Sequence, residues 1–125
     1  MKITGFRPLI VTKDQENVVA LFEALGFEKR HTKKDIEGGA NVGIAMKDAN
    51  GNRISIASSS KDRPDITGIQ INVDNFQEAY DFFIGQGFID PRGDKTTVTS
   101  SDQATMLFSP SGFAITVSQH IKDHD

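Results

Sequence analysis

The sequence predicts an α+β fold in which two tandem βαβββ modules form a curved sheet that encloses a groove. Three observations predict it: a repeat of turn and boundary residues, two helical stripes of apolar residues, and strands that alternate apolar and polar side chains. The repeat has an offset of 61 residues, as Asp14/Asn75, Gly26/Gly87 and Phe27/Phe88 show (75−14, 87−26 and 88−27). We therefore expect a single domain of residues 1–125 made of two modules, 1–61 and 62–125.

The first module reads as a strand, a helix and three further strands. Pro8 lacks an amide hydrogen and belongs at an edge or opening of a sheet. Asp14 suits the N-cap of the helix, Gly26 suits the left-handed position after it, and Asn50-Gly51 suits a tight hairpin turn. The expected elements are a strand at 5–12, a helix at 15–25, and strands at 27–33, 40–47 and 53–58.

The second module repeats this order after a polar link at 58–65. Asn75 and Glu78 have the spacing of a capping box, and the helix that they open should end before Gly87. Pro110-Ser111-Gly112 suits the last hairpin turn. The expected strands are 66–73, 88–90, a short segment near 98, 104–109 and 113–119.

Composition restricts the function classes. A formal net charge of −3 argues against a general nucleic-acid-binding protein and weakly favours a cationic ligand through long-range attraction. The absence of cysteine excludes disulfides, thiolate nucleophiles and cysteine-bound zinc. No apolar run approaches the roughly 20 residues that cross a bilayer. Residues 1–20 show no export signal, so we expect a cytoplasmic protein without membrane partners.

The strands should turn one face to the helix of their own module and leave a second face that is small and polar. The residues on this second face are Arg7, Leu9, Val11, Ser55, Ala57, Gly68, Gln70, Asn72, Ala114, Thr116 and Ser118. A groove lined in this way is a plausible small-molecule site, although one face of an antiparallel sheet is often simply solvated. The predicted ligand-binding residues are Arg7, Leu9, Ser55, Ala57, Gln70, Asn72, Thr116 and Ser118.

Arg7 is the most informative residue of this face. Its guanidinium could bind a carboxylate or phosphate through two nitrogens, or it could form an ion pair with a neighbouring Asp or Glu. The sequence leaves both readings open.

The pattern resembles the glyoxalase I, bleomycin-resistance protein and extradiol dioxygenase superfamily, also called the vicinal oxygen chelate fold. The resemblance covers nearly the whole chain. It rests on the strand-turn-helix openings VTKDQENVVALFEALGF and NVDNFQEAYDFFIGQGF and on the hairpins KDANGNRISIA and FSPSGFAITVS. It implies a groove-enclosing sheet and, in metal-dependent members, four metal ligands that are usually His, Glu or Gln.

By motif register, the resemblance places those four ligand positions at Arg7, Ser55, Gly68 and Thr116. None of these residues suits a divalent cation, because glycine has no side chain, arginine repels the ion and hydroxyls are poor ligands. We therefore expect no metal and no other cofactor.

Two further sets of residues are weaker candidates. His120 and His124 have the i, i+4 spacing of a metal pair, with Asp123 and Asp125 close by, but chain ends usually fray. His31 could be a general base or an anion contact, although an exposed, solvated histidine is the commoner case.

The favoured hypothesis is a metal-free protein similar to the bleomycin-resistance branch, which binds a small molecule as a homodimer and sequesters it. The first alternative is a lyase or isomerase of the glyoxalase I type with a displaced metal, using Arg7, His31 or Glu37. The second is an accessory or regulatory module whose sheet face binds a protein. Whether there is turnover, and which ligand is bound, the sequence leaves open.

Overall fold

The structure is a computed structural model that describes residues 1–36, 41–59, 64–91, 93, 97–98 and 102–120. Its contacts divide the chain into two compact units. The N-terminal unit is Arg7–Thr67, and the C-terminal unit joins Met1–Phe6 to Gly68–Asp125. No helix among the described residues has the length and apolar character needed to cross a membrane.

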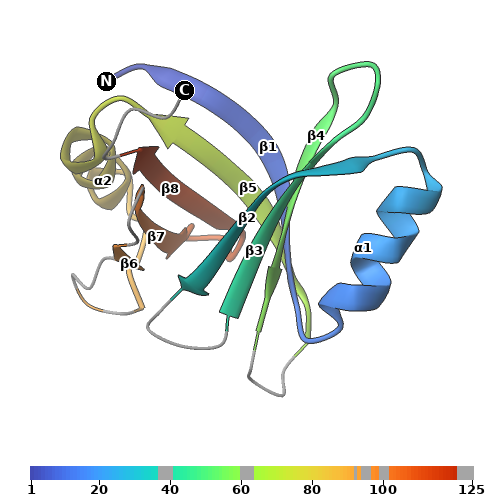
Figure 1. The fold of residues 1–125 in the computed structure, drawn as a ribbon. Helices are drawn as coiled ribbons and strands as arrows, with labels where there is room; N and C mark the ends of the chain where they lie inside the picture. Colours follow the sequence, from blue (N-terminus) through green and yellow to red (C-terminus); the bar gives the residue numbers. More distant parts are fainter. Residues whose placement is uncertain (37–40, 60–63, 92, 94–96, 99–101, 121–125) are drawn as a thin grey trace. The chain divides into compact units, whose positions relative to one another are not determined.

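The N-terminal unit has a four-stranded mixed sheet with the strand order β2-β3-β4-β1 (Figure 1). Strands β2, β3 and β4 pair antiparallel, and β4 pairs parallel with β1. The pairing of β1 with β4 starts at Leu9, directly after Pro8, which has no amide hydrogen to donate. The elements are β1 (Ile3–Thr12), α1 (Gln15–Ala24), β2 (Glu28–Ile36), β3 (Asn41–Lys47) and β4 (Arg53–Ser58).

The C-terminal unit repeats this plan with the strand order β5-β8-β7-β6. Strands β5 and β8 are parallel, and β8, β7 and β6 are antiparallel. The start of β1 joins this unit, because the Asp74 amide donates to the Lys2 carbonyl at 3.0 Å. The elements are β5 (Ile66–Val73), α2 (Phe76–Gly85), β6 (Thr97–Val98), β7 (Asp102–Phe108) and β8 (Ala114–His120).

The register of the strands repeats at the offset that the sequence shows. Leu9 pairs with Ser55 in the first unit, and Gln70 pairs with Thr116 in the second. The predicted fold class, α+β with two βαβββ modules, is therefore confirmed. The strand expected at 88–90 is reduced to one bridge, Ile89 to Phe108, because Pro91 cannot continue the ladder.

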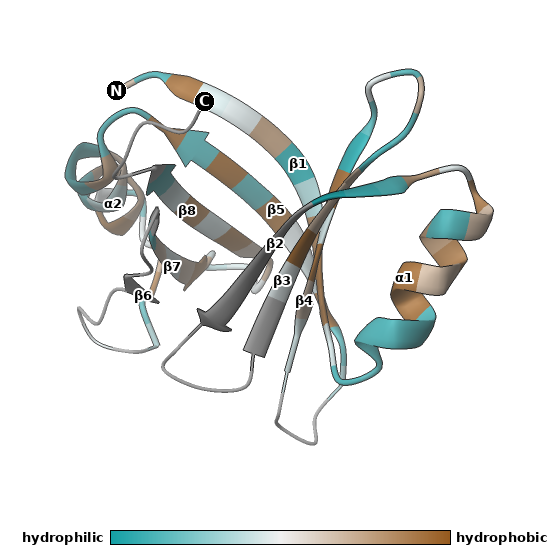
Figure 2. Ribbon diagram, in the orientation of Figure 1, coloured by the Kyte–Doolittle hydropathy of each residue, from teal (hydrophilic) through white to brown (hydrophobic). Residues whose placement is uncertain are grey.

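Each helix packs on the strands of its own unit. Val19 of α1 is buried with Met46, Ile54 and Ile56. In the C-terminal unit, α2 buries its residues Phe76 and Ala79 against the apolar face of β5, β7 and β8. Figure 2 shows hydrophobic and hydrophilic residues alternating along β5, as expected for a strand with one face on a helix.

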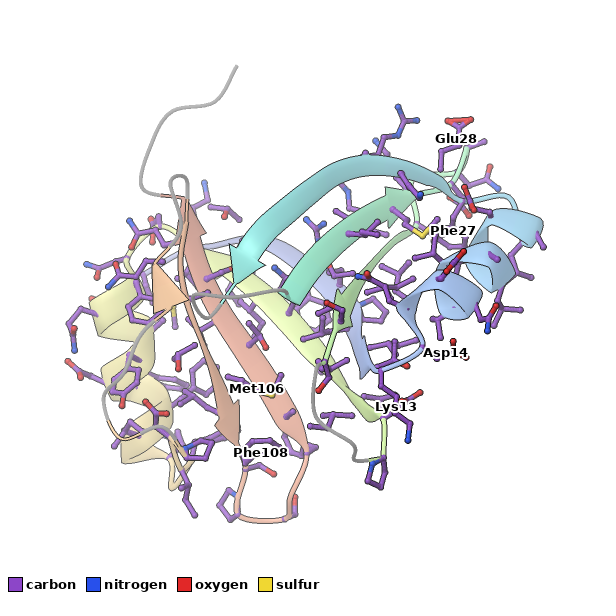
Figure 3. The ribbon with its side chains drawn as sticks, turned by 60° about the horizontal axis from the view of Figure 1, so that its bottom comes forward. Lys13, Asp14, Phe27, Glu28, Met106 and Phe108 are labelled. Atoms are coloured by element: carbon purple, nitrogen blue, oxygen red, sulfur yellow. The ribbon has the colours of Figure 1, made fainter. Side chains whose placement is uncertain are left out.

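The two helices begin differently. The Asn75 side chain accepts a hydrogen bond from the Glu78 amide at 3.0 Å, which confirms the predicted cap. Asp14 also precedes its helix (Figure 3), but its carboxylate accepts from the Asn17 side chain at 2.9 Å and caps no backbone amide. Asp14 therefore holds the predicted N-cap position, but its side chain makes no capping bond. Its backbone (φ −116°, ψ 45°) lies outside the extended region that aims a cap at the helix amides.

Candidate functional site

The face opposite α1 carries one half of the predicted site. Leu9 pairs with Ser55 and Val11 with Ala57, so these side chains share one face. The alternate residues, among them Ile54 and Ile56, pack on α1. Strand alternation adds Arg7, two residues before Leu9, to the face opposite the helix.

The face opposite α2 carries the predicted site residues of the C-terminal unit. Gly68 pairs with Ala114, Gln70 with Thr116 and Asn72 with Ser118. The residues between them on β5 and β8 form the core under α2. The register thus places all eight predicted site residues on the face opposite the helix of their own unit, and their role in binding stays a prediction.

Several of these residues are shielded from solvent. Leu9 is 7% exposed, Ser55 8% and Ser118 2%. A fully solvated sheet face would leave such side chains open to water. The simple alternative of a solvated face therefore does not describe these positions.

In the described part of the chain, each helix-free face holds one buried polar atom without a partner. Among the described residues, three buried side-chain atoms make no hydrogen bond: Arg7 Nε, Thr105 Oγ1 and Thr116 Oγ1. Arg7 and Thr116 belong to the predicted site, whereas Thr105 pairs with Val117 on the helix side. Buried polar groups in native proteins normally have a partner, so unpaired ones need an explanation.

Arg7 has an unusual electrostatic environment. Partial burial lowers the pKa of its guanidinium, and the charge of nearby Arg53 lowers it further. The structure shows no ion pair from Arg7 to a described carboxylate. The ion-pair interpretation of Arg7 is therefore not supported within the described residues.

Asn72 and Ser118 bind each other. The Ser118 hydroxyl donates to Asn72 Oδ1, within the paired strands β5 and β8. The sequence suggested two independent hydrogen-bonding groups here. Their mutual bond uses the Ser118 donor and leaves Gln70 and Thr116 as the more available polar groups.

The four positions at which the resemblance implies metal ligands do not fit a metal. Arg7, Ser55 and Thr116 offer a cation and two hydroxyls. At Gly68 an added Cβ would lie 2.4 Å from the Ala114 carbonyl oxygen, so a side chain there would collide with the neighbouring strand. Within the part of the chain that the structure describes, no three His, Asp or Glu residues lie together as a metal site requires.

The remaining candidates are only partly described. Glu37, Asp123, His124 and Asp125 lie outside the described residues, and the side chains of His31 and His120 do as well. The backbone places His31 in β2 and His120 at the end of β8.

Sequence reasoning missed Arg53 and Lys47. Lys47 pairs with Arg53, and Ala45 with Ser55, so both cations lie on the face that carries Ser55. Alternation counted back from Ser55 would have found Arg53 from the sequence alone.

Comparison with known proteins supports the fold. No family model matches the chain, and no curated protein sequence matches it. A methylmalonyl-CoA epimerase structure aligns with a TM-score of 0.65 at 13% identity, over 93% of this chain and 94% of the other. A glyoxalase I variant from Zea mays aligns with a TM-score of 0.65 at 14% identity, over 98% of this chain and 45% of that longer chain.

A third structure is a glyoxalase/bleomycin resistance protein/dioxygenase superfamily member from Vibrio splendidus 12B01. It aligns with a TM-score of 0.54 at 14% identity, over 94% of this chain and 99% of the other. Identities this low establish the fold and nothing finer. The chain has the fold of the glyoxalase, bleomycin-resistance protein and dioxygenase superfamily, as its two βαβββ modules indicated.

Proposed function

We propose that this protein binds a small organic molecule on a helix-free sheet face and holds it without a metal ion. The observation that carries the proposal is an unsatisfied buried atom on the helix-free face of each unit, Arg7 Nε in the N-terminal unit and Thr116 Oγ1 in the C-terminal unit. A bound ligand with hydrogen-bonding groups would supply the missing partners. Gln70 would add a neutral polar contact beside Thr116, and Leu9 would contribute apolar surface on the face that carries Arg7.

We also propose that the protein sequesters its ligand and does not convert it. The described polar side chains of the predicted site are hydroxyls, amides and one guanidinium. General acid–base catalysis is usually carried out by His, Glu, Asp, Lys, Tyr or Cys, and arginine remains protonated at neutral pH. The eight predicted site residues therefore include no group suited to proton transfer.

The metal content of the untagged protein is the first test. We expect far less than one metal ion per chain by mass spectrometry, and no rise in melting temperature with Ni²⁺, Zn²⁺, Mn²⁺ or Fe²⁺. Specific binding to the folded state would stabilise it. One metal ion per chain together with a clear stabilisation would contradict the proposal and favour the lyase or isomerase alternative.

A matched pair of threonine variants tests the binding face. Thr116 and Thr105 each bury a hydroxyl without a partner, on opposite faces of the same unit. Valine removes the hydroxyl at little change in shape, so Thr116→Val and Thr105→Val should each raise the free energy of unfolding by about 1 kcal/mol. Urea denaturation measures the free energy of unfolding of both variants.

Only Thr116→Val should alter ligand binding. Compounds that raise the melting temperature of the wild type would be selected from a library of metabolites and drug-like molecules. Their stabilising effect should fall with Thr116→Val and persist with Thr105→Val. If every compound raised the melting temperature of both variants as much as that of the wild type, its binding site would not include Thr116.

A further inference from the structure

A row of cations crosses the N-terminal unit on the face opposite α1. Lys47 on β3 pairs with Arg53 on β4. On the paired strands β1 and β4, Leu9 lies opposite Ser55. Arg7 and Arg53 each lie two residues before these partners. Because parallel strands keep their register, Arg7 and Arg53 come side by side. The effect of the Arg53 charge on Arg7 agrees with this placement.

The internal repeat shows how unusual this row is. Arg7, Arg53 and Lys47 correspond, at the offset of 61, to Gly68, Ala114 and Phe108 of the C-terminal unit. There, Gly68 and Ala114 pair closely, and Phe108 pairs with Ala114. The fold therefore needs no charge at these positions, and the second copy does without any.

The two described carboxylates next to the row have other partners, and neither forms an ion pair with Lys47 or an arginine of the row. Glu28 pairs with Lys47 across β2 and β3, but its carboxylate forms an ion pair with Arg30 at 3.6 Å. Asp48 follows Lys47, but its carboxylate accepts hydrogen bonds from the amide and the side chain of Asn52 at 2.8 and 2.9 Å. Arg7 Nε itself is buried and has no partner.

We propose that Arg7 and Arg53, with Lys47 beside them, bind a carboxylate or phosphate group of the small-molecule ligand. This inference rests on the proposed function and specifies its ligand class. It also departs from the weak expectation of a cationic ligand, because the local charge on this face is opposite in sign to the net charge of −3.

The chemistry of two adjacent guanidiniums suits an oxyanion. A guanidinium presents planar, parallel N–H donors that match two oxygens of a carboxylate or phosphate. An anion would satisfy Arg7 Nε and relieve the repulsion between Arg7 and Arg53 at once. Partial burial of Arg7 would also protect this interaction from screening by salt.

An NMR titration of the arginine side chains tests the proposal. Inorganic phosphate and succinate would be added separately at constant ionic strength, with chloride as the balancing anion, while the Nε–Hε signals are followed. We expect saturable shifts of the Arg7 and Arg53 signals with at least one of the two anions. Saturation with phosphate only, succinate only or both would assign the preferred group.

Three charge-removing variants provide the comparison. Arg7→Gln and Arg53→Gln should each weaken the anion affinity about tenfold or more, since each removes charge-assisted hydrogen bonds. Arg30→Gln removes the same charge from the same unit at an exposed, paired position, and it should leave the affinity unchanged. Shifts that do not saturate, or an equal loss in all three variants, would overturn the inference.

This outcome is separable from that of the proposed function. A neutral compound that binds the wild type and loses binding in Thr116→Val, together with no saturable Arg7 shift from phosphate or succinate, would retain the proposed function and overturn the anion site. Stoichiometric metal would overturn the metal-free function even if phosphate bound to the arginines.

Discussion

Gly68 occupies a point where the backbone of the next strand excludes even a methyl group. An added Cβ would lie 2.4 Å from the Ala114 carbonyl oxygen and 3.0 Å from its carbonyl carbon. Strands β5 and β8 pair at these two residues, so neither backbone can move away without loss of the ladder. Glycine is therefore explained here by strand packing, and this explanation is independent of any ligand.

Gly68→Ala should lower the free energy of unfolding by about 1–3 kcal/mol through overpacking. Gly85→Ala is the matched control, because nothing lies within 4 Å of a Cβ added at this last residue of α2. Alanine favours helix over glycine, so this control should gain up to about 1 kcal/mol. Urea denaturation of both proteins measures the difference, and equal stabilities would contradict the close approach seen at Gly68.

At the scale of elements, the turn between β3 and β4 and the turn between β7 and β8 are equivalent in the repeat. Different side chains accept their backbone hydrogen bonds. Asp48 and Ser109 occupy equivalent positions, and their amides donate to the carbonyls of Asn52 and Phe113 at 3.0 and 2.8 Å. The Asp48 carboxylate accepts from the amides of Asn50 and Asn52. The Ser109 hydroxyl instead accepts from the amides of Gly112 and Phe113, both at 3.0 Å. Only the first hairpin should therefore respond to pH.

The pKa of Asp48 is lowered, first by the hydrogen bond from the Asn52 side chain and then by bonds from backbone amides. A lowered folded-state pKa means that the carboxylate stabilises the fold above its ordinary value of 3.8 and loses this effect as the pH falls below it. Wild type should therefore be more stable than Asp48→Ser near neutral pH, by a small amount because the site is exposed. The difference should vanish in acid.

Melting temperatures measured across this pH range would test the expectation. Ser109→Ala serves as the comparison, because its loss of about 1 kcal/mol should be the same in acid and near neutral pH. A gap between wild type and Asp48→Ser that stayed constant with pH would contradict a titrating hairpin.

At the scale of the whole molecule, strand β1 is divided between the two units. Its first residues join Met1–Phe6 to the C-terminal unit, and Arg7 onward belong to the N-terminal unit. The division falls beside Pro8, where the chain has no amide hydrogen for a ladder bond. The start of the chain is thus tied to the second module by the bonds between Lys2 and Asp74.

The homodimer stays a prediction at this scale. It follows from the resemblance and from strand edges expected near Pro8 and Ala40. The second of these edges is not present, because β3 (Asn41–Lys47) pairs with β2 on one side and with β4 on the other. Unpaired strand edges are ready templates for association. Sedimentation equilibrium should give twice the chain mass of 13.7 kDa, and a mass that stayed at 13.7 kDa at all concentrations would exclude the dimer.

The sequence by itself determined the order of elements, both helix boundaries and the residues on each strand face. These features depend on local periodicity and on turn residues, both of which can be identified from the sequence of neighbouring residues. The β4 and β5 ranges agree with expectation at 53–58 and 66–73. The implied groove between the strands stays a prediction.

The tertiary structure alone decided which polar groups are free. Asn72 and Ser118 are 46 residues apart and bond to each other, whereas Arg7 Nε and Thr116 Oγ1 have no partner. The neighbour of Arg7 is Arg53, again far away in sequence, and Gly68 is required by a clash with Ala114. Hydrogen-bond satisfaction, repulsion between charges and steric exclusion depend on distances between strands, and periodicity along one strand carries no information about them.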